Sequence, residues 1–139
     1  MLLIGLVLII TTLNQHNSYA EKLDRDWIAV QEWARSNSDK HDKFLITQGA
    51  GNFRTRSLRS SIAEVDSALA WVDPDTLVIN SHQSELVNRA FDGNVWDIEQ
   101  LIYLGNQWNG QYIVVMGPYT PQNIHASFES GPYTVIKVP

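Results

Sequence analysis

Apolar residues recur at helical spacing in two stretches of the chain. The first stretch, Leu23–Ser36, places a set of apolar side chains on one face: Leu23, Trp27, Val30 and Ala34, with Trp33 beside them. The second stretch, Asp97–Trp108, carries Ile98, Leu101, Ile102 and Tyr103 on one broad face, and Asp97 is a good N-cap. We expect a helix in each stretch, and a shorter helix over Ser84–Phe91.

Short apolar runs alternate with these helices and predict β-strands. The expected strands are Phe44–Thr47, Ser61–Val65, Tyr112–Met116, Ile124–Phe128 and Tyr133–Val138. The last two flank the turn Ser130-Gly131-Pro132 and predict a closing β-hairpin. Helices that alternate with strands predict an α/β fold, a compact α/β sandwich with helices packed on a small mixed β-sheet.

The middle of the chain gives weaker signals. Ser67–Trp71 favours a helical turn that ends at Asp73-Pro74-Asp75, and Leu77–Ile79 is ambiguous between a strand and a helix start. For the core, we expect two central neighbouring strands with Trp33 and Leu101 packed over them; their residues are Phe44, Leu45, Ile113, Val114 and Val115.

The first residues form an uncharged apolar run, Leu2–Leu13. A helix needs about 20 apolar residues to cross a bilayer, so this run is too short to span one alone. It suits either the end of a membrane helix or a signal peptide with small residues at Ser18-Tyr19-Ala20, although no Lys or Arg precedes it; a buried core helix is a third interpretation. We therefore expect residues 1–19 to be a hydrophobic segment and residues 20–139 a soluble extracytoplasmic α/β domain.

Composition narrows the classes of function. The 139 residues suit one domain, with 44% hydrophobic and 18% charged residues. Ten basic and fifteen acidic side chains give a net charge of −5, which disfavours nucleic acid as a partner. The chain has no cysteine, which excludes disulfides and thiolate metal sites. Residues 60–139 hold nine acidic and two basic groups, so this stretch carries a charge of −7.

Motifs for cofactors, metals and nucleophiles are weak. Gly49-Ala50-Gly51 follows a strand, but Arg54 stands where a dinucleotide-binding loop has its third glycine, and the following residues do not suggest a helix. We therefore interpret this segment as a turn and expect no cofactor. The four histidines lie at positions 16, 41, 82 and 125, without metal-ligand spacing, so we expect no metal. No serine lies in a nucleophile elbow, and no catalytic residue is assigned.

Three arginines form the densest cationic cluster, Arg54, Arg56 and Arg59. Guanidinium groups bind phosphate and carboxylate in a bidentate way, so contact with an anion or a lipid phosphate is one hypothesis. On a strand, Arg54 and Arg56 would share one outward face. Solvated or ion-paired arginines are the alternative. The five tryptophans could similarly form a sugar-stacking platform, but core packing is favoured.

Several short motifs spread over roughly residues 20–138 form a recognisable series: Trp33-Ala34, Phe44-Leu45, Phe53-Arg54, Arg59, the stretch Gln107–Val115 and the closing hairpin Phe128–Val138. In these motifs the chain resembles the soluble C-terminal region of bacterial multi-pass membrane proteins of the glycosyltransferase-like type. At Asn37-Ser38-Asp39 the proline of the family pattern is missing. The family's catalytic acidic residues lie between earlier membrane helices, so the resemblance assigns none here.

The resemblance implies a non-catalytic accessory domain of a membrane protein. Its expected partners are its own membrane part, membrane lipid or a lipid-linked sugar, and its expected location is the periplasm or cell surface. A secreted small binding protein with a cleaved signal peptide is the alternative.

Overall fold

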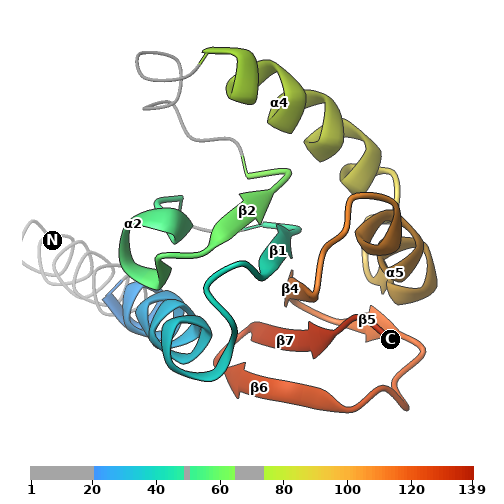
Figure 1. Ribbon diagram of the computed structural model, residues 1–139. Helices are drawn as coiled ribbons and strands as arrows, with labels where there is room; N and C mark the ends of the chain where they lie inside the picture. The colour runs from blue at the N-terminus through green and yellow to red at the C-terminus, as the bar shows by residue number, and fades with distance from the viewer. Residues whose placement is uncertain (1–20, 49–50, 65–73) are drawn as a thin grey trace, which may run out of the picture.

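A mixed five-stranded β-sheet forms the centre of the computed structural model, which describes residues 21–48, 51–64 and 74–139. Helices cover both faces of this sheet (Figure 1). After a helix that includes residues 21–37, the elements are β1 (Lys43–Ile46), α2 (Phe53–Ser57), β2 (Ser60–Ile62), α4 (Pro74–Asn88), β3 (Trp96–Asp97), α5 (Ile98–Gln107), β4 (Tyr112–Met116), β5 (Tyr119–Thr120), β6 (Ala126–Ser130) and β7 (Tyr133–Lys137). The α/β sandwich expected from the alternation of helices and strands is confirmed.

The strand order in the sheet is β2-β1-β4-β7-β6. β2, β1 and β4 run parallel, so their carboxyl ends lie at one edge of the sheet, and Leu45 is in register with both Ile62 and Ile113. β7 pairs antiparallel with β4 and with β6, which confirms the expected closing hairpin. A separate two-stranded parallel pair joins β3 to β5.

Alternate residues of the central strands supply two separate cores. Leu45, Ile113 and Val115 lie in the core beneath α4 and α5. Phe44 and Val114 lie in the core on the opposite face, under helix 21–37 and α2. Each of these five side chains is fully buried, and burial of one such side chain stabilises the fold by about 1.5–3 kcal/mol. The expected pair of central strands is therefore confirmed, with Leu101 packed on one face and Trp33 on the other.

Both amphipathic helices are confirmed. Helix 21–37 buries Trp27, Val30 and Ala34 against the sheet. α5 begins after Asp97, whose side chain accepts a hydrogen bond from the backbone N–H of Gln100. This cap satisfies one of the backbone donors that a helix N-terminus leaves unpaired. Among the helices of the described residues, none has the length and apolar character needed to cross a bilayer.

Two expectations about helices were wrong. The residues after Gly51 do form a helix, the five-residue α2, which lies between Asn52 and Leu58, both in the left-handed conformation. The short helix expected over Ser84–Phe91 is instead part of a longer one, because α4 begins at Pro74, continues through the ambiguous stretch Leu77–Ile79 and ends at Asn88. Proline is well tolerated in the first turn of a helix, because backbone N–H groups there have no acceptor within the helix and the N–H that proline lacks is not needed. The helical turn expected at Ser67–Trp71 lies outside the described residues.

Candidate functional site

A pocket of about 230 Å³ lies at the carboxyl ends of β1 and β2. β1 leads into α2, whose Phe53 packs on Phe44 on one face of the sheet. β2 is followed in the chain by α4, whose Val87 belongs to the core on the other face. Where successive connections leave a sheet toward opposite faces, a crevice opens at the carboxyl ends of the strands, and ligands of open α/β sheets bind there.

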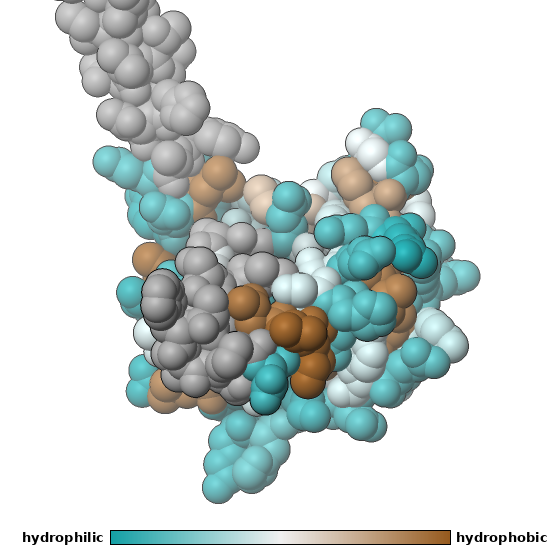
Figure 2. Space-filling view, turned by 90° about the horizontal axis from the view of Figure 1, so that it is seen from above, coloured by the Kyte–Doolittle hydropathy of each residue, from teal (hydrophilic) through white to brown (hydrophobic). Residues whose placement is uncertain are grey.

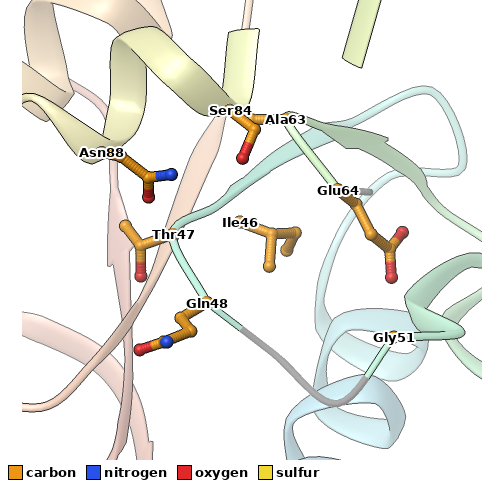
Figure 3. A pocket seen from close by; sticks show the side chains of 8 residues that line it. All are labelled: Ile46, Thr47, Gln48, Gly51, Ala63, Glu64, Ser84 and Asn88. Atoms are coloured by element: carbon orange, nitrogen blue, oxygen red, sulfur yellow. The ribbon is translucent and has the colours of Figure 1, made fainter. Parts of the chain in front are cut away.

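The pocket is lined mainly by polar groups from three elements and the segments that follow them. The lining residues are Ile46, Thr47, Gln48, Gly51, Ala63, Glu64, Ser84 and Asn88. Figure 3 shows Ser84 and Asn88 reaching from α4 toward the end of β1, with Glu64 on the other side of Ile46. Carboxylate, amide and hydroxyl side chains line this small volume, as they do in sites for polar ligands.

Glu64 is the charged member of the lining and is held in place from both faces of the sheet. Its side chain is buried, with only 7% of the residue exposed. Its Oε1 accepts a hydrogen bond of 2.8 Å from the backbone N–H of Phe53, at the start of α2. Its backbone carbonyl accepts one of 2.9 Å from Nδ2 of Asn80 in α4. The position of the carboxylate is therefore fixed by two separate helices.

Ala63 adopts a left-handed backbone conformation, with φ of 64°, directly before Glu64. An L-residue with a Cβ pays roughly 1–2 kcal/mol for this conformation. The backbone N–H of Ala63 donates to Oε1 of Gln83 in α4, which helps to hold the bend. Strain of this kind persists where the surroundings impose it, and it concentrates at ligand sites. The bend ends β2 and turns Glu64 toward α2.

Thr47, at the rim of the pocket, has a structural role. Its hydroxyl donates to the carbonyl of Val114 at 3.0 Å and accepts from the N–H of Met116 at 3.3 Å. The side chain therefore continues the pairing of β1 with β4 beyond the last residue of β1. This arrangement leaves Gln48, Glu64, Ser84 and Asn88 as the side chains of the lining best suited to contact a ligand.

The arginine cluster lies on and after α2, not on a strand. Residues two positions apart on a helix are about 200° apart around its axis, so Arg54 and Arg56 do not share the outward face that strand spacing predicted. Nε of Arg54 donates to the Ser61 hydroxyl at 2.8 Å. Nη1 of Arg56 lies 3.6 Å from a carboxylate oxygen of Glu32, and half of the Arg56 side chain is exposed.

Arg59 is the most extensively hydrogen-bonded of the three arginines. Its Nη2 donates to the carbonyls of Arg35 and Ser38, each at 2.8 Å, and its Nε donates to the Ser38 hydroxyl at 2.9 Å. These acceptors lie at the end of helix 21–37, where backbone carbonyls lack helical partners. Arg59 thus caps that helix from the segment before β2.

The other sequence candidates fall into structural positions. Within the described residues, no group of three or more His, Cys, Asp or Glu side chains is placed to hold a metal ion. Trp27 and Trp96 are buried, and their indole N–H groups donate to the carbonyls of Gly51 and Met116. Trp33 and Trp108 pack at the edges of the two cores, and Trp71 lies outside the described residues. The tryptophans that can be placed are core anchors.

The sequence prediction did not identify the pocket residues. Thr47, Glu64, Ser84 and Asn88 form no local motif, because they come from elements far apart in the chain. The available signal was positional. Thr47 and Glu64 each follow a short apolar run, and the carboxyl ends of parallel strands meet at one edge of a sheet. That inference needs the strand order, which the apolar pattern alone does not supply.

Comparison of the chain with family models, with curated proteins and with solved structures finds no match.

Proposed function

We propose that this chain is a non-catalytic, extracytoplasmic accessory domain of a glycosyltransferase-like membrane protein, and that it binds a small polar ligand at the carboxyl ends of β1 and β2. The observation that carries the binding function is the pocket itself. Its lining joins the Glu64 carboxylate to Ser84 and Asn88 of α4 at the usual ligand position of an open α/β sheet.

Binding suits the lining better than catalysis does. A nucleophilic hydroxyl needs a general base within hydrogen-bond reach that can take its proton. The Thr47 hydroxyl is instead committed to the backbone of β4, and the Glu64 Oε1 accepts from a backbone N–H. Such groups hold a ligand in a fixed orientation without a proton-transfer route between them.

The accessory role at a membrane rests on the sequence. The apolar run Leu2–Leu13 precedes helix 21–37, and the resemblance to the C-terminal region of glycosyltransferase-like membrane proteins spans residues 20–138. Helix 21–37 is fixed on the sheet through Trp27, Val30 and Ala34. An anchor that precedes this helix would therefore hold the folded domain at the membrane surface, where a lipid-linked sugar or its acceptor is within reach.

Contact of the arginine cluster with lipid phosphate is a separate part of the proposal. Arg56 is the best placed of the three, because half of its side chain is exposed and its partner Glu32 is exposed as well. Arg59 donates to neighbouring backbone and hydroxyl groups from all three of its guanidinium nitrogens, and Arg54 donates twice to Ser61. A secreted binding protein that is cleaved after Ala20 is the alternative, and it would use the same pocket.

The binding function can be tested by filling the pocket. Amide NMR spectra of the full chain in detergent micelles would be recorded during titration with D-glucose, D-glucosamine and D-glucuronate. We expect at least one of these sugars to shift the resonances of Gln48, Glu64, Ser84 and Asn88. Ser84→Leu fills the pocket and should abolish the shifts. Ser81→Leu, one turn earlier on the exposed surface of α4, should keep them.

Two results would count against binding at this site. One is that none of the three sugars shifts the pocket resonances. The other is that Ser84→Leu and Ser81→Leu give the same shifts as the unmodified chain.

A further inference from the structure

We propose that the pocket at the carboxyl ends of β1 and β2 selects a ligand that carries a protonated amine, and that Glu64 is its counter-ion. This inference rests on the proposed binding function and specifies its ligand. The amine belongs to a hydroxylated small molecule of the amino-sugar class, since the rest of the lining offers hydroxyl and amide groups.

The first argument is the charge of the lining. Glu64 is the acidic residue among the lining residues, and none of them is Lys or Arg. All ten Lys and Arg residues of the chain lie in the described part, since residues 1–20, 49–50 and 65–73 contain none. The ion pairs seen there join Arg56 to Glu32 and Arg89 to Glu85, so neither involves Glu64.

The second argument is the cost of burying a carboxylate without a cation. Taking a charge out of water costs several kcal/mol unless it is paired and hydrogen-bonded. The backbone N–H of Phe53 supplies one hydrogen bond to Oε1. An ammonium group has three donors and a full positive charge, so a bound amine would complete the pairing of this side chain.

The third argument is the negative charge of the part of the chain that supplies most of the polar lining. The pocket draws Glu64, Ser84 and Asn88 from residues 60–139, the stretch with nine acidic and two basic groups. Of those two basic residues, Arg89 is already paired with Glu85. A surface of one sign raises the local concentration of ligands of the opposite sign and repels those of the same sign. Phosphorylated and carboxylated sugars should therefore bind more weakly than neutral or cationic ones.

The remaining lining groups explain why the cation should be organic. Divalent metals in proteins need several carboxylate, imidazole or carbonyl ligands, and the described residues contain no cluster of three His, Cys, Asp or Glu. Asn88 and Ser84 line the pocket from α4, with Ile46 between them and Glu64 (Figure 3), and their amide and hydroxyl groups can both donate to and accept from ligand hydroxyls.

The test uses three sugars with the same ring and different charge. D-glucosamine, D-glucose and D-glucuronate would be titrated into the full chain in micelles at slightly acidic pH, with the pocket resonances as the readout. We expect D-glucosamine to bind about tenfold more tightly than D-glucose, as one charge-assisted hydrogen bond implies, and D-glucuronate to bind most weakly.

Glu64→Gln tests the assigned counter-ion. Glutamine keeps an oxygen that can accept from the Phe53 N–H, so the local fold should persist, while the preference for D-glucosamine over D-glucose should fall to within about twofold. Glu129→Gln on β6 removes the same charge from an exposed site and should keep the preference. Asn88→Asp adds a second carboxylate to the lining and should raise the preference, which gives a test independent of Glu64.

The outcomes separate the two proposals. If none of the sugars reaches the pocket, the binding function itself is wrong. If sugars bind there but D-glucose or D-glucuronate binds as tightly as D-glucosamine, the binding function stands and the amine preference is overturned. A preference that survives Glu64→Gln, or that Asn88→Asp fails to raise, would also overturn it.

Discussion

Tyr112 connects the packing of the sheet to the behaviour of the protein at high pH. Its ring stacks on Phe44 with a centroid distance of 4.8 Å and meets Trp33 edge-on at 5.6 Å. Burial, and secondarily the negative charge of Asp42, raise the pKa of the Tyr112 phenol above its ordinary value near 10. The neutral phenol is therefore the form that the folded state favours.

A raised pKa gives a defined pH dependence of stability. Below about pH 10 the phenol is neutral in both states and its contribution is fully present. As the pH rises above that value, the unfolded chain ionises first, so the free energy of unfolding falls until the folded phenol also ionises. Tyr112→Phe removes this loss. Urea unfolding followed from about pH 8 to pH 11 should show a shallower alkaline decline for Tyr112→Phe than for the unmodified protein.

Tyr103→Phe is the matched control, because Tyr103 lies on the surface of α5 with 60% of its area exposed. It should keep the alkaline decline of the unmodified protein. Equal declines in all three proteins would show that the Tyr112 phenol does not contribute to this pH dependence.

At the scale of elements, Arg59 ties the end of helix 21–37 to the segment before β2. Lysine in its place would keep the charge but lose the planar fork that reaches the carbonyls of Arg35 and Ser38 together. Hydrogen bonds to a charged group contribute about 1.5–3 kcal/mol each, so Arg59→Lys should lower the free energy of unfolding by about 2 kcal/mol. Urea unfolding at neutral pH measures this change.

Arg56→Lys provides the comparison for that prediction. The exposed pair of Arg56 with Glu32 should contribute less than about 1 kcal/mol, so this variant should unfold close to the unmodified protein. A loss of stability as large as that of Arg59→Lys would argue against the different roles assigned to the two arginines.

The elements differ in how well the sequence predicted them. β4 and α5 were predicted because their burial follows the apolar pattern and Asp97 caps α5 as expected. The sequence pattern did not predict α4 as one helix, because some of its apolar side chains are exposed and one of its polar side chains is buried. Val78 and Ile79 are 69% and 57% exposed, whereas Asn80 is 3% exposed. Asn80 is buried because it donates to the carbonyl of Glu64, so the pattern fails where the helix supports the pocket.

The outer surface of α4 shows the same exposure of apolar side chains. In Figure 2, which looks down on this side of the molecule, apolar surface interrupts a largely hydrophilic face. Val78 and Ile79 contribute apolar area to the outside of α4. This helix is held by hydrogen bonds of Asn80 and Gln83 to the two residues after β2 and by the packing of Val87 in the core, rather than by a continuous apolar stripe.

At the scale of the whole molecule, we expect the apolar segment to carry membrane association and the domain to fold without it. Burying the apolar side chains of Leu2–Leu13 in a bilayer is worth on the order of 10 kcal/mol or more, whereas an arginine near an anionic surface contributes about 1 kcal/mol. The full chain should therefore stay in the membrane fraction after a high-salt wash. A chain that lacks residues 2–13 should be recovered from the soluble fraction as a folded protein, as its circular dichroism and cooperative unfolding would show.

The same fractionation distinguishes membrane association through the apolar segment from association through the arginines. If the shortened chain stays with membranes at low salt and leaves them at high salt, the charged surface around Arg56 carries the association, because exposed charges are screened over about 8–10 Å. An aggregated shortened chain together with a soluble full chain would refute the expected topology.

The place of β7 in the sheet sets the order of events during synthesis. β7 lies between β4 and β6, and the N–H of Val138 donates to the carbonyl of Gln111 beyond its end. Until Tyr133–Lys137 has left the ribosome, one long edge of β4 stays open. At about 5–20 residues per second, the 21 residues that follow Met116, up to Lys137, take roughly 1–4 s to add. For that interval the nascent chain lacks the partner of this apolar edge, and an unpaired edge of this kind is a site for pairing with another chain.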